Sequence, residues 1–377
     1  MDSRKGSLLT LEKIYNRKNN SFDIVRFILA IVVIYSHSYI LLLGPAHSAD
    51  PIVKFTNNQI SIATLAVNCF FVISGFLITQ SLLSIGSFVK YLKNRILRIF
   101  PAFIFSVLLV AFVIGPLTTG LGIKGYLADE NGSAYQFIFR NLTFNLFGYA
   151  WSIKDVFSAA PFPGAANGSI WTLKHEFALY LILPLCNLFL VLGIKRIMLF
   201  LSFFVSSLSV LNILFKYRFF NLLGDHYWVL STNEYDNFIK LAPFFLFGSI
   251  FYLYKDKLII HTRLVLLCII VSLLALKAGL LNVFLIFTLP YIILTICVKY
   301  KTSQFRKYGD FSYGLYIYAF PIQQLMVYYF LDKLNVATFF IFSTIFTFLI
   351  SFFSWHFIEK KALSFKGFKL RYYGKEA

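Results

Sequence analysis

Residues 22–43 read FDIVRFILAIVVIYSHSYILLL, an apolar stretch with very few ionisable side chains. Twenty-two helical residues extend for about 33 Å, which is enough to cross the hydrocarbon core of a bilayer. The stretch contains Arg26 and His37, and ionisable residues inside such a segment are rare and commonly functional. These residues therefore predict a membrane helix that does more than anchor the chain.

The composition of the whole chain agrees with a membrane protein. Of its 377 residues, 59% are hydrophobic, 19% are aromatic and only 14% are charged. Soluble domains are about half apolar and about one quarter charged, so the composition excludes a soluble enzyme and a disordered chain. Four cysteines lie in apolar runs without a C-x-x-C pair, which argues against a disulfide framework and against a zinc site.

The fold class predicted from these runs is an all-α integral membrane protein with about ten transmembrane helices. The least secure division falls at 277–282, where an apolar run continues past Gly279. We expect residues 1–21 to be a cytoplasmic segment, 22–358 a single transmembrane domain and 359–377 a basic tail. The expected spans are 22–43, 60–83, 99–119, 175–193, 197–215, 238–254, 264–281, 283–298, 310–330 and 336–357.

The positions of the basic residues predict the orientation in the membrane. With the N-terminus in the cytoplasm, cytoplasmic segments hold 24 of the 35 Lys and Arg residues, external segments hold 9, and 2 lie within spans. Because cytoplasmic loops are enriched in Lys and Arg, both termini are expected to be cytoplasmic. The net charge of +19 is then mainly a topology signal, and without a basic stripe on a soluble domain no nucleic-acid partner is expected.

Arg26 and His37 are expected to lie on one face of the first helix. They are 11 residues apart, which corresponds to three turns plus about 20° and to about 16 Å along the axis. Histidine is the side chain best suited to accept a proton near neutral pH. The alternative is an arginine that reaches the membrane interface and a histidine hydrogen-bonded between helices.

The second predicted span contains NCFFVISGFLIT (68–79), and the basic segment KNRILRIFP (93–101) follows it. Ser74 beside Gly75 indicates close helix packing, and its hydroxyl could also line a pocket. Arg95 and Arg98 are three residues apart and share a helix face. Such arginines either anchor the cytoplasmic end of a span or bind a phosphorylated ligand.

The external loop ends in SIWTLKHEFALYLILPL (169–185), which places Trp171 and Glu176 near the outer end of the fourth span. We expect Glu176 to lie at roughly the depth of His37 and to orient it or bind the acceptor. Trp171 is either a binding residue or a membrane-interface anchor. No spacing of His, Cys and carboxylate residues is typical of a metal site, so no metal is expected.

Five segments, in order, resemble motifs of the membrane acyltransferase-3 family over nearly the whole chain. FDIVRFILAIVVIYSH resembles its R-x10-H first span, and NCFFVISGFLIT its FFVxSGFLI segment. KNRILRIFP resembles RRxxRIxP, SIWTLKHEF resembles LWSLxxE, and GDFSYGLYIYAFPIQQ (309–324) resembles SYxLYLxHxP.

The resemblance implies an enzyme that moves an acyl group, commonly acetyl, from cytoplasmic acyl-CoA to a hydroxyl of a glycan outside. It assigns His37 to the essential histidine, Arg26 to its paired arginine, and Arg95 and Arg98 to the donor side. Trp171 and Glu176 match the acceptor-side motif. His37 would act as general base or carry the acyl group covalently, and the sequence does not separate these two mechanisms.

Two departures from the family pattern limit what the resemblance implies. Ala319 stands where the family has a late histidine, so no role of that histidine is transferred. The common double acid is reduced to Glu176 followed by Phe177. Some relatives carry a fused external hydrolase-like domain, and without one the chain would complete transfer alone or pass the group to a separate extracytoplasmic partner.

The sequence therefore predicts an O-acyltransferase of the bacterial inner membrane, and within that class it favours an O-acetyltransferase. Acetyl-CoA would be a co-substrate, and no bound cofactor is expected. The acceptor would be O-antigen of lipopolysaccharide, capsule, exopolysaccharide or a lipid-linked oligosaccharide. Other expected contacts are membrane lipid and either a second copy of the chain or an external partner. The alternatives are a transporter or flippase, or a glycan polymerase of the same pathway.

Overall fold

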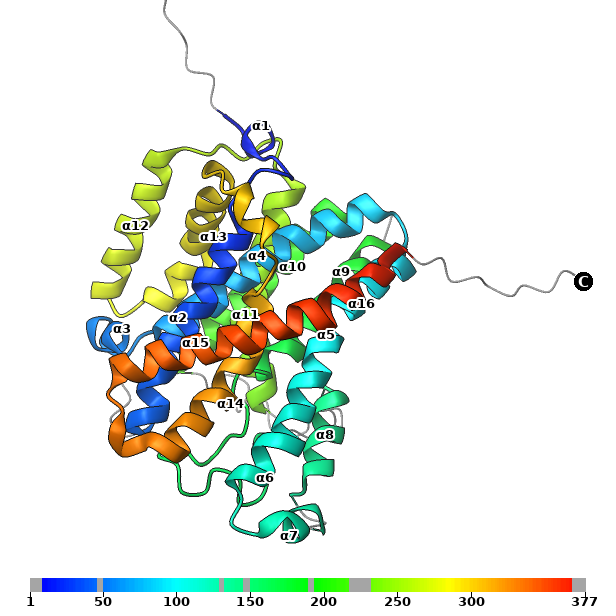
Figure 1. Ribbon diagram of the computed structural model, residues 1–377. Coiled ribbons are helices and arrows are strands. Elements are labelled where there is room, and N and C mark those ends of the chain that lie inside the picture. Colours follow the sequence, from blue (N-terminus) through cyan, green and yellow to red (C-terminus); the bar gives the residue numbers. More distant parts are fainter. Residues whose placement is uncertain are drawn as a thin grey trace, which may run out of the picture.

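The computed structural model describes residues 9–45, 50–128, 132–144, 150–188, 193–216 and 232–367. These residues form a bundle of helices, and their only β-type pairing is an isolated bridge between Thr10 and Ile259. Figure 1 shows the pair α12 and α13 on one side of the bundle and α5 with α8 on the other. The helical class predicted from the sequence is confirmed.

The first three predicted spans correspond to α2 (Phe22–Leu43), α4 (Ile62–Ile85) and α5 (Phe88–Leu109), which continues through the π-helical turn η2 (Val110–Ile114) into α6 (Gly115–Thr118). The boundaries of α2 agree with the prediction. The predicted start of the third span at residue 99 is wrong, because the helix begins at Phe88. Arg95 and Arg98 therefore lie on α5 itself, three residues apart as the sequence indicated.

The other seven predicted spans also contain helices. These are α9 (Trp171–Leu188), α10 (Ile194–Leu214), α11 (Thr232–Leu253), α12 (Thr262–Lys277), α13 (Leu281–Lys299), α14 (Ser312–Phe330) and α15 (Val336–Ser354), which continues through η6 (Trp355–Glu359) into α16 (Lys360–Ser364). The insecure division is a true break, because Gly279 adopts a φ of 74° between α12 and α13.

Short helices complete the described part of the chain. They are α1 (Leu11–Ile14), α3 (Pro51–Phe55), α7 (Gly122–Ala128), α8 (Ala134–Leu142), η4 (Ser303–Lys307), η5 (Leu331–Lys333) and η7 (Phe365–Gly367). The expected spans 197–215 and 238–254 leave an external segment between them, and residues 217–231 of this segment lie outside the described residues.

Within the described residues, six helical segments are long and apolar enough to cross a membrane: Phe22–Leu43, Ile62–Ile85, Phe88–Thr118, Ile194–Leu214, Leu281–Lys299 and Val336–Ser364. The chain is thus a multi-pass membrane protein by length and composition. A count of ten spans and a cytoplasmic location of both termini stay predictions.

Helices α4 and α11 cross closely because glycines face backbone on both sides. A Cβ atom on Gly75 would lie 1.9 Å from the carbonyl oxygen of Phe245, and one on Gly248 would lie 2.1 Å from that of Val72. Small residues permit such approach in membrane helices. The crossing confirms the packing role predicted for the Ser74–Gly75 pair and fixes the position of Ser74.

A buried amide joins α14 to the first helix. Gln323 Nε2 donates hydrogen bonds to the carbonyl oxygen of Ile34 and to Ser38 Oγ, both at 3.0 Å. Such polar bonds between membrane helices contribute about 0.6 kcal/mol on average. α14 also packs on α15, so α2, α14 and α15 form one layer beside the α4–α11 pair.

Candidate active site

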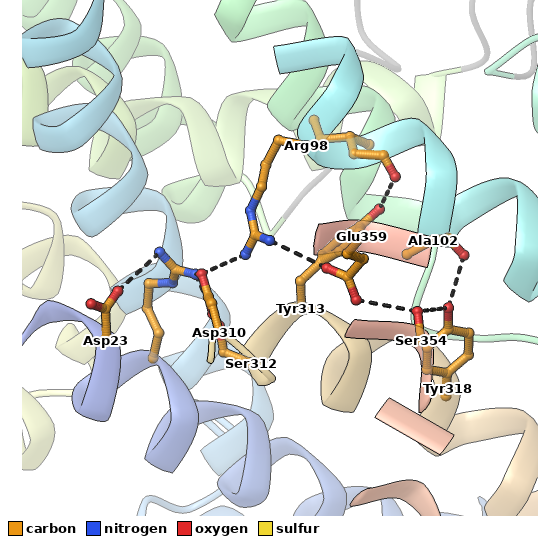
Figure 2. A network of polar contacts seen from close by, with 11 residues as sticks. Asp23, Arg98, Ala102, Asp310, Ser312, Tyr313, Tyr318, Ser354 and Glu359 are labelled. Atoms are coloured by element: carbon orange, nitrogen blue, oxygen red, sulfur yellow. Dashed lines mark hydrogen bonds and ion pairs between the residues drawn. The ribbon is translucent and has the colours of Figure 1, made fainter. Parts of the chain in front are cut away.

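Asp310, two residues before the start of α14, binds two arginines from different helices. Its Oδ2 atom accepts a hydrogen bond from Arg26 on α2 and one of 2.6 Å from Arg98 Nη2 on α5. Arg98 Nη1 also lies 3.2 Å from Glu359 Oε2 on η6, as Figure 2 shows. We call Arg26, Arg98, Asp310 and Glu359 the charge network.

The charge network continues into the bundle through hydroxyl groups. Ser354 Oγ donates to Glu359 Oε1 at 3.2 Å and lies 2.8 Å from the hydroxyl of Tyr318, which donates to the carbonyl oxygen of Ala102 (Figure 2). Buried ionised groups persist only when their remaining lone pairs and protons are also bonded. The network therefore ties α2, α5, α14 and the α15 segment together at one end of the bundle.

Arg95 differs from the other two arginines because no carboxylate among the described residues forms an ion pair with it. Its Nη2 atom donates a long hydrogen bond of 3.4 Å to Ser81 Oγ, and its buried Nε atom has no hydrogen-bond partner. Within the described ranges, no Asp or Glu oxygen lies within 4.0 Å of the Arg95 guanidinium. A poorly compensated, buried guanidinium is suited to bind an incoming anion.

A second cation, Lys366, lies near this arginine. It belongs to η7, which packs against α5, and Figure 1 shows α16 running beside α5 just before η7. Partial desolvation there, together with the charges of Arg95 and Arg98, lowers the pKa of Lys366 to about 8. Arg95, Arg98 and Lys366 thus bring several positive charges together, and an anionic ligand would help to balance them.

Glu176 is bonded to two hydroxyl groups from α4 and α9. Its Oε1 atom accepts from Ser74 Oγ at 2.7 Å and from the hydroxyl of Tyr180 at 2.5 Å, and these two hydroxyls lie 2.8 Å apart. Ser74 and Glu176 thus come together with the three arginines around one cavity of about 150 Å³. We call it the arginine cavity; its polar lining consists of Arg26, Ser74, Arg95, Arg98, Thr172, Glu176, Tyr180, Ser312, Tyr313 and Tyr316.

His37 lines a different and larger cavity of about 860 Å³, which we call the histidine cavity. Its Nδ1 atom is buried and finds no hydrogen-bond partner among the described residues. Its ring meets Phe320 edge to face, with centroids 5.4 Å apart. Besides His37, the polar lining includes Ser36, Asp50, Asn58, Gln59, Ser61, Thr64, Asn68, Ser169, Trp171, Ser209, Asn237, Lys240, Asn282 and Tyr316.

The structure divides the predicted site residues between these two cavities. Arg26, Ser74, Arg95, Arg98 and Glu176 line the arginine cavity, whereas His37 and Trp171 line the histidine cavity. Glu176 was expected at the depth of His37, but its hydrogen bonds run to Ser74 and Tyr180 instead. Trp171 and Glu176 lie more than one helical turn apart on α9, so Trp171 lines the histidine cavity while Glu176 lines the arginine cavity.

Sequence reasoning missed four residues of this region: Tyr180, Asp310, Glu359 and Lys366. Asp310 could have been noticed as the lone acid in the motif GDFSYGLY. Glu359 could have been noticed as an acid in a basic segment. Both acids meet arginines more than 200 positions away, so only the tertiary structure reveals their partners. In the described part of the chain, no group of three or more His, Cys, Asp or Glu side chains could hold a metal ion.

A family model described as an acyltransferase domain matches residues 19–356. The chain therefore belongs to the acyltransferase-3 family and is an acyltransferase that transfers groups other than aminoacyl groups, as its five motifs predicted.

Two curated relatives are similar to this chain. An O-acetyl transferase of Shigella phage Sf6 is 28% identical over 356 residues, which cover 92% of this chain and 97% of that protein. Nodulation protein 10 of Rhizobium leguminosarum bv. viciae is 30% identical over 168 residues, 44% of this chain and 43% of that protein. No solved structure matches the chain.

Proposed function

We propose that the protein is an inner-membrane O-acetyltransferase that uses cytoplasmic acetyl-CoA and acts on a hydroxyl of an extracytoplasmic or lipid-linked glycan. The observation that carries the proposal is the division of the site into an arginine cavity and a histidine cavity. A polyanionic donor made in the cytoplasm and a neutral acceptor outside require two such environments. The name of the phage relative supports the acetyl group and the oxygen acceptor.

The donor would bind at the arginine cavity through its phosphates. Arg26 and Arg98 share Asp310, so their charges are already largely compensated. Arg95 and Lys366 are the cations best placed to meet phosphate oxygens. Arg95 forms no ion pair with a carboxylate of the described residues, its Nε atom has no hydrogen-bond partner there, and the charge of Arg95 acts on Lys366. The charge network then serves to hold α5, and with it Arg95, in position.

The acyl transfer would take place at His37. The acceptor hydroxyl oxygen attacks the thioester carbon, and His37 takes the hydroxyl proton as the carbon–oxygen bond forms. The tetrahedral intermediate then collapses, the carbon–sulfur bond breaks, and His37 returns the proton to the departing thiolate. General base catalysis of this kind contributes typically ~10²–10⁴-fold in rate.

Glu176 would act on the donor side. Its carboxylate holds the hydroxyls of Ser74 and Tyr180 in the arginine cavity, where they can meet polar groups of the donor arm. Trp171, on the other side, offers a ring on which a sugar can stack.

Comparison of surface polysaccharide from cells with and without the gene, by mass spectrometry, tests the proposed function. We expect ester-linked acetyl groups to disappear without the gene and to return with the wild-type gene. They should not return with His37→Ala at equal protein level in the membrane. Unchanged acetylation in cells without the gene would contradict the proposal and favour a transporter or polymerase.

A further inference from the structure

The two cavities meet at one wall. Among their lining residues, Val67 and Tyr316 are the two that both cavities share. Along α4, residues up to Asn68 line the histidine cavity, and residues from Val67 onward line the arginine cavity, so the two linings overlap there. On α14, Tyr316 is the residue that lines the histidine cavity. Ser312 and Tyr313, nearer the start of α14, line the arginine cavity.

On α9 and α2, too, the residues that line one cavity give way to residues that line the other at this level. On α9, Trp171 lines the histidine cavity and its neighbour Thr172 lines the arginine cavity. On α2, Arg26 lines the arginine cavity and Val33 is the first residue to line the histidine cavity. Val33 is one turn, about 6 Å, from His37. An acyl group that travels from the arginines to His37 must therefore pass this level.

Tyr316 is held firmly at the wall. Its hydroxyl lies 2.8 Å from Thr172 Oγ1, and its ring meets Phe70 edge to face with centroids 5.8 Å apart. Tyr316 and Thr172 are both buried. A ring held by a hydrogen bond from one side and an aromatic contact from another cannot swing aside without loss of both contacts.

We propose that Tyr316 and Val67 form a constriction that limits the length of the acyl group passed to His37. The wild-type constriction admits an acetyl group and rejects chains of four or more carbons. This inference rests on the proposed function, since it concerns the acyl group of the same donor. The hydrogen bond to Thr172 keeps the Tyr316 ring in the position that closes the passage.

The test compares acetyl-CoA with butyryl-CoA as donors for the purified full-length protein in nanodiscs. The readout is the ratio of kcat/KM for butyryl-CoA to that for acetyl-CoA, because a general loss of folding lowers both values and leaves the ratio unchanged. Each added methylene changes discrimination by about 10-fold or more in a tight pocket, so we expect a wild-type ratio of roughly 0.01.

Tyr316→Ala opens the wall from one side and should raise this ratio at least about tenfold. Val67→Ala opens it from α4 and should act in the same direction, which keeps the test valid if Tyr316→Ala folds poorly. Tyr316→Phe keeps the ring and should leave the ratio closer to wild type than either alanine variant. Tyr126→Ala is the matched control, because it removes another buried ring that lines neither cavity.

A ratio that stays at the wild-type value in both Tyr316→Ala and Val67→Ala would overturn the constriction, as would an equal rise in Tyr126→Ala. These outcomes leave the proposed function standing, since the wild type would still use acetyl-CoA. Turnover of neither donor by the wild type would instead contradict the proposed function, and the constriction with it.

Discussion

Asp310 Oδ2 and Arg98 Nη2 lie 2.6 Å apart, although 212 positions separate the two residues in the sequence. The same carboxylate oxygen binds Arg26, so a single acid holds α2 and α5 in their relative positions. Each of the three side chains keeps only about one fifth of its surface exposed, at 19% for the arginines and 22% for Asp310. The relative positions of Arg26 and Arg98 therefore depend on a carboxylate that the two arginines share.

Replacement of Asp310 by Asn should destabilise the fold, because it leaves two close guanidinium groups without their shared counter-charge. Removal of one partner of a buried ion pair costs about 3–5 kcal/mol, and the remaining exposure reduces this to roughly 3 kcal/mol. Thermal unfolding in detergent measures the loss. Asp332→Asn, an exposed acid on η5, is the control and should leave Tm unchanged.

Arg95→Gln should weaken donor binding without a comparable loss of stability, since no carboxylate of the described residues would lose an ion pair. We expect KM for acetyl-CoA to rise about 10- to 100-fold, the range for loss of a charge-assisted hydrogen bond. KM for an acetyl thioester without phosphates should change little. An equal increase for both donors would show that Arg95 does not bind the phosphates.

We expect donor binding to depend on pH through the titration of Lys366. Because the pKa of Lys366 is about 8, its charge is lost as pH rises from 7 to 9, and the attraction for phosphate is lost with it. KM for acetyl-CoA should rise by about two- to fivefold over this interval. Lys366→Gln should have the higher KM at pH 7 and a flatter profile, whereas Lys360→Gln should behave as wild type. A wild-type profile in Lys366→Gln would exclude this role.

Glu176→Gln separates a donor-side role from the orientation of His37. Since Glu176 is bonded to Ser74 and Tyr180, the variant should lower kcat/KM for acetyl-CoA and leave the midpoint of the pH–kcat profile in place. Ser74→Ala should reproduce the effect on the donor. A shifted midpoint in Glu176→Gln alone would mean that this carboxylate acts on the histidine.

The sequence predicted the positions of the helices well, whereas the roles of the site residues stay predictions. Apolar runs located a helix in every expected span, because lipid requires each segment to satisfy its own backbone hydrogen bonds. They misplaced the start of α5, since residues 88–98 are basic and amphipathic and so lie outside an apolar run. Helical periodicity put Arg26 and His37 on one face, and both do line cavities.

The division of the site between two cavities was beyond the sequence. It depends on the wall formed by Val67 and Tyr316, whose helices are neighbours only in the folded chain. The pairing of Asp310 with Arg98 is likewise a tertiary contact that no spacing along the chain encodes. Local patterns report which residues share a helix face, and they do not report which faces meet.

The account rests most directly on His37 as the base that transfers the acyl group. The decisive measurement is transfer of labelled acetyl from acetyl-CoA to surface polysaccharide by the purified protein, wild type against His37→Ala, with equal Tm and equal acetyl-CoA affinity established for both. We predict transfer by the wild type and a loss of ~10²–10⁴-fold or more in the variant. Transfer by His37→Ala at a rate near that of the wild type would contradict the account.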